Sequence, residues 1–308
     1  MTTTVLDHST GYVTDGGLET DLIFHAGVDL PEFAAFPLLD QPSGRALLRG
    51  YYDGYARIAE AAGAALLLES PTWRASLDWG RLLGYDQPAL DRVNVAAVRL
   101  LTEIADDWRG RVPQIRLAGV IGPRGDGYRT STISPEAARA YHLPQARALA
   151  GAGADLLSAY TLTSVGEALG IAVAAREVGV PASLSFTVET DGRLPDGTTL
   201  ADAVAAVDAE CAPAYFGINC AHPRHIERGL SDGGAWRERI AVVRANASTL
   251  SHAELDEAED LDDGDPLELA DDLGRLRPLL PGLRVIGGCC GTDARHVSAM
   301  WSSMPIGV

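Results

Sequence analysis

Short apolar runs alternate with longer segments of helical periodicity along this chain. Eight runs rich in β-branched or other apolar residues predict strands at 12–17, 64–70, 115–123, 155–161, 182–188, 215–220, 240–247 and 284–290. The segments that favour helices are 43–62, 87–108, 135–152, 165–178, 200–211, 223–230, 265–280 and one that begins near 292. In the third, Ala137, Tyr141, Gln145 and Leu149 recur four residues apart, as on one helix face. Ser134 before Pro135 and Asp265 before Pro266 are typical of helix starts.

The predicted strands are mostly continuous and apolar, which favours parallel strands buried on both faces. Eight strand–helix units of this kind predict an α/β fold, a (β/α)8 TIM barrel that forms a single domain over residues 1–308. The alternative is an open doubly wound sheet. The first predicted strand is not followed by a Gly-x-Gly-x-x-Gly motif, which weakens the dinucleotide-binding form of that alternative.

Net charge excludes several kinds of partner. The chain of 308 residues carries a formal charge of −17 and has a calculated pI near 4.7. Nucleic acids and anionic membranes bind clustered positive charge, so we expect neither as a partner, and small molecules remain. No apolar run approaches the roughly 20 residues that span a bilayer. Since the first residues resemble no signal peptide, we expect a cytoplasmic protein.

The chain has no lysine, because all 25 basic residues are arginine. Mechanisms that need a lysine, such as a Schiff base or a P-loop, are therefore excluded. One segment stands out by charge: residues 254–272 contain 11 acidic side chains and no basic one. Their spacing does not match a calcium-binding EF-hand loop, and we interpret the segment as a solvated loop and helix start.

Three of the four cysteines follow predicted strands. Cys220 ends the sixth strand, and Cys289 and Cys290 end the eighth. Two strands separated by one neighbour lie about 10 Å apart, so side chains leaning in from both can share one zinc ion. Adjacent cysteines on a regular strand point to opposite faces, and Gly287, Gly288 and Gly291 supply the freedom to leave that geometry. Three thiolates leave a fourth position open, as in catalytic zinc sites.

Other interpretations of these residues stay open at this point. The thiols also fit buried small side chains or a strained vicinal disulfide. Cys211 lies in a helical segment and is expected in the core. His222 and His225 follow Cys220 closely and could supply a fourth ligand or a proton relay, but we interpret them as loop and helix-start residues.

Several motifs carry a resemblance to a known family. GINC at 217–220 and GGCCGTDARH at 287–296 resemble the two zinc motifs of the homocysteine S-methyltransferase family. TDGGLETDL at 14–22 resembles the first-strand motif of that family, and SFTVETDGRLPDGTTL at 185–200 resembles its fifth-strand region. The resemblance extends over about residues 12–300.

The resemblance implies a zinc-dependent (β/α)8 methyltransferase that moves a methyl group to the sulfur of homocysteine and gives methionine. It implies zinc binding by Cys220, Cys289 and Cys290, and acceptor binding by Asp15, Gly16, Gly17, Thr72 and Asn219.

Thiol chemistry supports this mechanism. A free thiol has a pKa near 8.5, and coordination to zinc deprotonates it. Sulfonium donors suit the transfer because they leave as neutral compounds, and cation–π contacts suit them, with Trp73 and Tyr160 as candidates. A chain of this length has no room for a folate or cobalamin domain beside the barrel, which favours S-methylmethionine or S-adenosylmethionine as donor.

One position departs from the family. Its better-known members carry a glutamate at the end of strand four that binds the acceptor's amino group, and this chain has Tyr160 there. Glu69, after the second strand, and Glu189, after the fifth, are possible substitutes. A different thiol or selenol acceptor is the alternative. A non-catalytic zinc-binding barrel is more remote, and a zinc hydrolase is disfavoured because such enzymes bind zinc through histidine and carboxylate.

Overall fold

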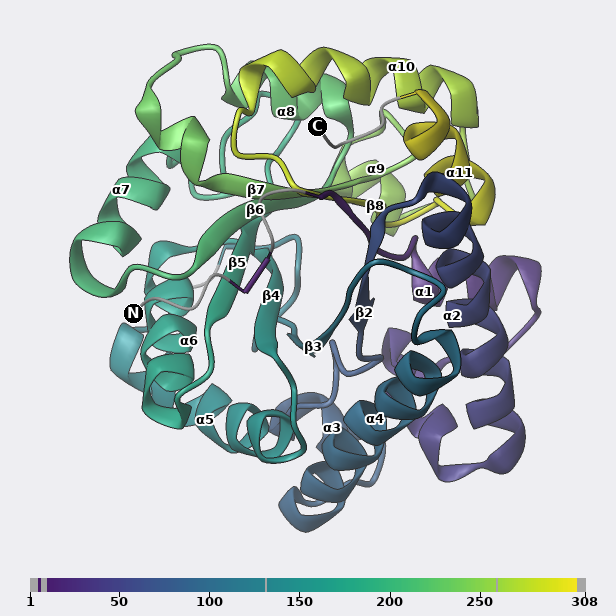
Figure 1. The fold of residues 1–308 in the computed structure, drawn as a ribbon. Helices are drawn as coiled ribbons and strands as arrows, with labels where there is room; N and C mark the ends of the chain where they lie inside the picture. Colours follow the sequence, from purple (N-terminus) through teal and green to yellow (C-terminus); the bar gives the residue numbers. More distant parts are fainter. Residues whose placement is uncertain (1–4, 7–9, 131, 259, 304–308) are drawn as a thin grey trace.

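The computed structural model describes every residue except 1–4, 7–9, 131, 259 and 304–308, and it shows a closed barrel of parallel strands (Figure 1). Each strand pairs with the next, and the last pairs with the first. The strands are β1 (Tyr12–Val13), β2 (Ala65–Glu69), β3 (Ile115–Ile121), β4 (Leu156–Leu162), β5 (Ala182–Phe186), β6 (Tyr215–Ala221), β7 (Ile240–Ala245) and β8 (Val285–Gly288). The predicted (β/α)8 barrel is confirmed, and the open-sheet alternative is wrong.

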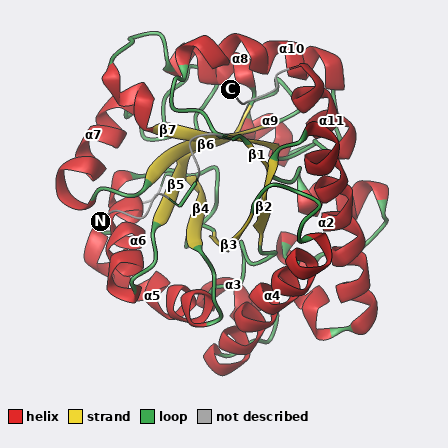
Figure 2. Cartoon of the chain, in the orientation of Figure 1, coloured by secondary structure: helices red, strands yellow, loops and turns green. Residues whose placement is uncertain are grey.

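Helices form a ring around the barrel (Figure 2). The predicted ones are α2 (Pro42–Ala62), α4 (Gln87–Trp108), α5 (Pro135–Gly151), α6 (Val165–Val178), α7 (Leu200–Cys211), α8 (Pro223–Gly229), α10 (Pro266–Leu276) and α11 (Ala294–Ser303). Shorter elements that the pattern did not predict are α1 (Leu18–Thr20), η1 (Asp21–His25), η2 (Pro31–Phe33), η3 (Phe36–Asp40), α3 (Leu77–Leu82), η4 (Ala235–Arg239), α9 (His252–Asp256) and η5 (Arg277–Leu279). Among the described residues, no helix is both long and apolar enough to cross a membrane.

Caps and periodicity explain the helix positions. Ser134 accepts a hydrogen bond from Ala137 N at the start of α5, and Asp265 caps α10, as predicted. The inner face of α5 differs from the prediction, because Ala137 is exposed while Ala138 and His142 are buried. A spacing of four residues exceeds the helical period of 3.6, so the buried face drifts around the helix.

Two strands are irregular where they approach the rim. The register between β4 and β5 shifts between Ala159 and Leu162, and Thr161 has a φ of 60°. The register between β6 and β7 shifts between Asn219 and Ala221, and Cys220 has a φ of 56°. Positive φ values are uncommon for residues other than glycine, and bulges of this kind re-aim side chains. Both bends lie at the rim formed by the carboxyl ends of the strands.

Candidate metal centre and active site

A cavity of about 390 Å³ lies at the carboxyl ends of the strands, where TIM barrels place their active sites. Ten of the eleven predicted site residues line it: Asp15, Gly16, Gly17, Glu69, Trp73, Tyr160, Asn219, Cys220, Cys289 and Cys290. The exception is Thr72. Its hydroxyl donates to the carbonyl of Val120, 2.7 Å away, and its side chain is fully buried outside the cavity lining.

Three thiols meet at the wall of this cavity. The Sγ atoms of Cys220, Cys289 and Cys290 all lie within 4.8 Å of one another, and those of Cys220 and Cys290 are 3.6 Å apart. Within the described residues this is the one group of histidine, cysteine and carboxylate side chains close enough to hold a metal ion. His222 caps helix α8 and His225 lies within it, as interpreted from the sequence. Cys211 is buried at the end of α7, apart from the cluster.

Local backbone conformation brings the thiols together. Cys289 and Cys290 follow the last residue of β8, so the pair has left extended geometry. Gly291 has a φ of 79°, a left-handed conformation that fits the predicted freedom to leave extended geometry. Gly287 and Gly288 serve a different purpose from the one predicted. A Cβ on Gly288 would lie 1.8 Å from Thr292 Oγ1, and one on Gly287 would lie 2.5 Å from Thr14 Cγ2. Both glycines allow close packing.

Tyr128, on the loop between β3 and α5, contacts the thiols and was missed from the sequence. Its Oη lies 3.1 Å from Cys220 Sγ and 3.5 Å from Cys290 Sγ. Its ring stacks on that of His252, with centroids 4.2 Å apart. No motif marks a loop tyrosine of this kind, so only the folded chain reveals it.

His252 also holds the backbone of the bent strand. Its Nε2 lies 2.7 Å from the carbonyl oxygen of Cys220, and its Nδ1 lies 2.9 Å from a carboxylate oxygen of Glu189. Thr187 donates to the same carbonyl oxygen at 3.2 Å. Glu189 is therefore engaged with His252 and is not among the residues that line the cavity, whereas Glu69 is.

The cysteine thiols of the cluster differ in pKa. Hydrogen bonds from Cys220 and Cys290 hold the pKa of the Cys289 thiol well below its usual range, and the positive charge of Arg244 lowers it further. Hydrogen bonding to Cys289 and Cys290, with burial, raises the pKa of Cys220. The cluster therefore stabilises a thiolate, the form of cysteine that binds metals.

A buried arginine joins two carboxylates beside the thiols. Arg244 on β7 forms an ion pair with Asp15 at 2.5 Å and another with Glu69. The hydroxyl of Tyr160 donates to Glu69 Oε1 at 2.6 Å, and that of Thr14 donates to Glu69 Oε2 at 2.8 Å. Tyr160, where the resemblance predicts a glutamate, therefore holds a carboxylate that comes from β2.

Arg244 also fixes the surrounding backbone. It donates to the carbonyl oxygens of Gly16 at 2.8 Å and Gly288 at 2.9 Å. Despite this arginine, burial raises the pKa of Asp15 from 3.8 to about 7. With two carboxylates and one guanidinium, the cluster carries a net negative charge when both acids are ionised. Such a cluster suits a ligand with an ammonium group.

The acidic segment helps to form the cavity mouth, a role that the sequence did not predict. Its residues in the cavity lining are Leu255, Asp256, Ala258, Asp260, Leu261 and Asp262. The aspartates remain exposed to solvent, in agreement with the predicted solvated loop. Together with Asp126, on the loop that carries Tyr128, they make the entrance acidic.

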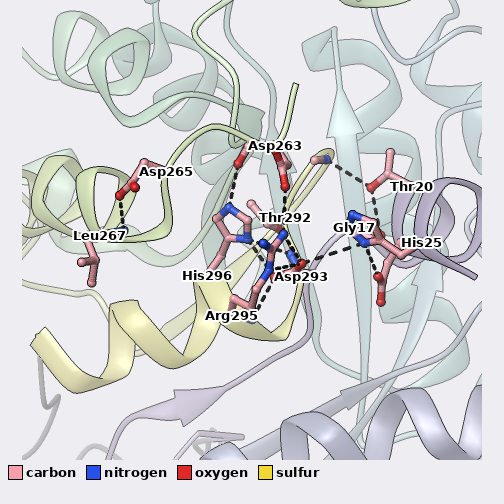
Figure 3. A network of polar contacts seen from close by, with 12 residues as sticks. Gly17, Thr20, His25, Asp263, Asp265, Leu267, Thr292, Asp293, Arg295 and His296 are labelled. Carbon is pink, nitrogen blue, oxygen red and sulfur yellow. Dashed lines mark hydrogen bonds and ion pairs between the residues drawn. The ribbon is translucent and has the colours of Figure 1, made fainter. Parts of the chain in front are cut away.

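A network of polar contacts ties this segment to the thiol motif (Figure 3). His296 on α11 lies 2.9 Å from Asp293 Oδ1 and, through Nε2, 2.7 Å from the carbonyl oxygen of Asp263. Arg295 forms ion pairs with Asp263 at 2.8 Å and Asp293 at 2.7 Å. On the other side, Gly17 N donates to the carbonyl oxygen of Thr292 at 2.9 Å. We call the contacts among Asp263, Asp293, Arg295 and His296 the Asp293 network.

Comparison with known proteins identifies the family. The model of the homocysteine S-methyltransferase family matches residues 12–304. The chain belongs to the homocysteine S-methyltransferase family.

Curated relatives agree with this family assignment. The chain is 28% identical to homocysteine S-methyltransferase of Escherichia coli (strain K12), over 96% of each chain. It is 26% identical to homocysteine S-methyltransferase YbgG of Bacillus subtilis (strain 168), over 97% of this chain and 96% of that one. The crystal structure of the homocysteine methyltransferase MmuM from Escherichia coli, in its metallated form, has the same fold, with a TM-score of 0.76, 24% identity and coverage of 97% and 98%. This chain is accordingly a methyltransferase.

Trp73 and Tyr160 are the two aromatic residues predicted to contact a sulfonium donor. In the folded chain, each already contacts an arginine of the protein. The guanidinium of Arg74 lies 4.4 Å from the centroid of the Trp73 ring. That of Arg244 lies 5.0 Å from the centroid of the Tyr160 ring. An aromatic cage for the donor stays a prediction, and any such cage would use the other faces of these rings.

Asn219 locks the bend that places Tyr160. Its Oδ1 accepts from Thr161 N at 2.8 Å, and its Nδ2 donates to Thr161 Oγ1 at 3.0 Å. We expect Asn219→Ala to lower the free energy of unfolding by about 1–3 kcal/mol, because it leaves the buried amide of Thr161 without a partner. Urea unfolding of the purified protein measures this. Asn219→Ser, which keeps a short acceptor, is the control, and an unchanged midpoint for the alanine variant would contradict the role.

Proposed function

We propose that this chain transfers a methyl group from a small sulfonium donor to the sulfur of homocysteine, giving methionine, with zinc bound by Cys220, Cys289 and Cys290. The observation that supports this best is the thiol cluster at the wall of the cavity, beside a buried pair of carboxylates. The first feature suits activation of a thiol, and the second suits recognition of an amino acid.

The donor set fits zinc. Three sulfur ligands within reach of one ion are soft ligands of the kind that zinc prefers, and a fourth position remains for a substrate. Asn219 Nδ2 lies 3.8 Å from Cys289 Sγ, so an amide donor accompanies the thiol with the lowest pKa. Zinc bound there would lower the pKa of the acceptor's thiol and keep it as a thiolate at neutral pH.

The acceptor's amino acid group is assigned to the Asp15 side of the cavity. Asp15 and Glu69 would attract its ammonium group, and Arg244 would keep their carboxylates in place. The Gly16–Gly17 backbone lines the same region. In the family, a glutamate at the end of strand four supplies this carboxylate. Here Glu69 at the end of strand two would supply it, held in place by the hydrogen bond from Tyr160.

The chemistry is a single displacement. The acceptor thiol releases its proton to solvent, its sulfur forms a bond to the methyl carbon, and the carbon–sulfur bond of the donor breaks. The donor leaves as a neutral thioether that keeps the bonding electron pair. The protein contributes chiefly by holding the two sulfur atoms and the methyl carbon in line. S-methylmethionine and S-adenosylmethionine are the donors expected for this reaction.

The test is methionine formation by zinc-loaded, reduced enzyme supplied with homocysteine and S-methylmethionine, and separately with S-adenosylmethionine. We expect turnover with at least one donor and its loss after chelation, with recovery when zinc is restored. Full activity in metal-free protein would contradict the proposal. So would the absence of methionine when one zinc is bound per chain.

One observation favours a second candidate, the same chemistry on a thiol or selenol other than homocysteine. The carboxylate oxygens of Glu69 are already engaged by Thr14, Tyr160 and Arg244. 4-Mercaptobutyrate, which is homocysteine without its amino group, separates the two. A strong preference for homocysteine supports ammonium recognition, whereas equal kcat/KM values support the second candidate.

A further inference from the structure

Arg74, on the loop after β2, has guanidinium nitrogens that find no hydrogen-bond acceptor in the described part of the chain. The guanidinium lies between two indole rings, 4.4 Å from the centroid of Trp73 and 3.4 Å from that of Trp79. Its Nε and Nη1 atoms are buried and have no hydrogen-bond partner among the described residues. A buried donor left unpaired is costly, so such groups in proteins usually have a partner or a ligand. Arg74 is also one of the residues that line the cavity.

The second arginine of the cavity provides the contrast. Arg244 is buried and bonds to two carboxylates and three backbone carbonyl groups. Arg74 is half-buried, and it has no ion pair within the described part of the chain, although Asp126, Glu19 and Glu32 act on its charge. The cavity therefore has a buried cation that is paired with carboxylates, Arg244, and a half-buried one, Arg74, that forms no ion pair with any residue the structure describes.

Arg74 lies on the side of the cavity from which the methyl donor must approach. The acceptor's sulfur must reach the thiol cluster, and the methyl carbon then has to approach that sulfur from the open side of the cavity. Arg74 lies on that side, because it is half-buried whereas Arg244, Asp15 and Glu69 are all buried. Its planar fork of donors matches a carboxylate, and stacking on two indoles fixes the fork before a ligand arrives.

The negative charge at the cavity mouth limits which ligands can bind there. Asp126, Asp256 and Asp260 line the same cavity, so a ligand with several negative charges would be repelled. A ligand with one carboxylate and one or more cationic centres satisfies both Arg74 and these aspartates. We propose that Arg74 binds the carboxylate of the methyl donor, which restricts the donor to carboxylate-bearing sulfonium compounds. This inference rests on the proposed function.

The experiment compares S-methylmethionine with its carboxamide, which differs only in the carboxylate. We expect Arg74→Gln to lower kcat/KM for S-methylmethionine about 10- to 100-fold, as for loss of a hydrogen-bonded charge pair. The change should appear in the donor KM, with the acceptor KM unaltered. The carboxamide should be a poor donor for the unmodified enzyme and should lose little more in the variant.

Two further variants serve as controls. Arg74→Lys keeps the charge without the fork, and we expect a KM between those of the unmodified enzyme and Arg74→Gln. Arg81, an exposed arginine on α3, gives the matched control Arg81→Gln, which should change neither substrate's KM. Equal losses with both donors, or a change confined to the acceptor KM, would overturn the inference.

Binding separates this inference from the proposed function. Trp73 and Trp79 flank Arg74, so tryptophan fluorescence of the zinc-loaded enzyme should change on titration with S-methylmethionine. Saturable binding that Arg74→Gln weakens, without methionine formation, would contradict the proposed function while still showing that Arg74 binds the carboxylate of S-methylmethionine. The absence of S-methylmethionine binding to the unmodified enzyme would overturn the inference. Normal turnover with an unchanged donor KM in Arg74→Gln would overturn it while leaving the proposed function intact.

Discussion

Replacing Cys220, Cys289 or Cys290 singly with serine is expected to abolish zinc binding and to reduce methyl transfer by about a thousandfold or more, equivalent to about 4 kcal/mol of activation free energy. Each thiol lies within 4.8 Å of the other two, so each loss leaves two sulfur ligands for one ion. A serine hydroxyl is a poor replacement because its oxygen is hard and stays protonated. Zinc content per chain and the rate of methionine formation are the measurements.

Cys211 provides a matched control for these variants. It is buried at the end of α7 and lies outside the thiol cluster. Cys211→Ser should cost some stability while leaving one zinc per chain and near-normal turnover. Loss of zinc from this variant, or full zinc binding in any of the other three, would show that the cluster is not the metal site.

The second large effect is expected from Arg244→Met. This change leaves Asp15 and Glu69 buried together without their common cation, and breaking such a pair on one side costs about 3–5 kcal/mol of folding free energy. Urea unfolding at neutral pH measures it. Adding Glu69→Gln removes one of the two charges, so the double variant should be less destabilised than the sum of the single ones.

The pH dependence provides a further check on Arg244→Met. Burial already raises the pKa of Asp15 to about 7 in the intact protein, and removing the guanidinium raises it further. A carboxyl group whose pKa is higher in the folded than in the unfolded protein binds more protons when folded, so stability falls as the pH rises between those values. The destabilisation should therefore be larger at pH 8 than at pH 5. Equal losses at both values would mean that Arg244 acts through packing alone.

The barrel and the thiol cluster were predictable because both follow from short-range patterns. Continuous apolar strands imply parallel pairing, and parallel strands in a closed barrel bring Cys220, Cys289 and Cys290 to one rim. The bends at Thr161 and Cys220 were not predictable, since neither residue is a glycine and both conformations are imposed by neighbouring strands. The additional helices of the loops, such as α3 and α9, are too short to show a period.

The carboxylate–arginine cluster could be recognised only in the folded chain. Arg244 and Glu69 are 175 residues apart, and their contact depends on how the barrel closes. The sequence identified Glu69 as a possible replacement for the missing strand-four glutamate. It could not reveal that the hydroxyl of Tyr160 would hold this carboxylate, because a tyrosine at that position has no single meaning. Likewise, nothing in the pattern distinguished Arg74, whose guanidinium is stacked between two indole rings, from the many exposed arginines.

The Asp293 network lies between two parts of this rim, the metal motif and the acidic segment that lines the cavity mouth. The part of the acidic segment that lines the cavity begins at a capping box formed by Ser251 and Glu254. It ends where Asp263 contacts His296 and Arg295. Between these anchors most of its described residues line the cavity, and none of them supplies a ligand to the thiol cluster. We therefore expect that this part of the acidic segment can differ in sequence, and with it the choice of donor, as long as both anchors and the metal motif keep their places.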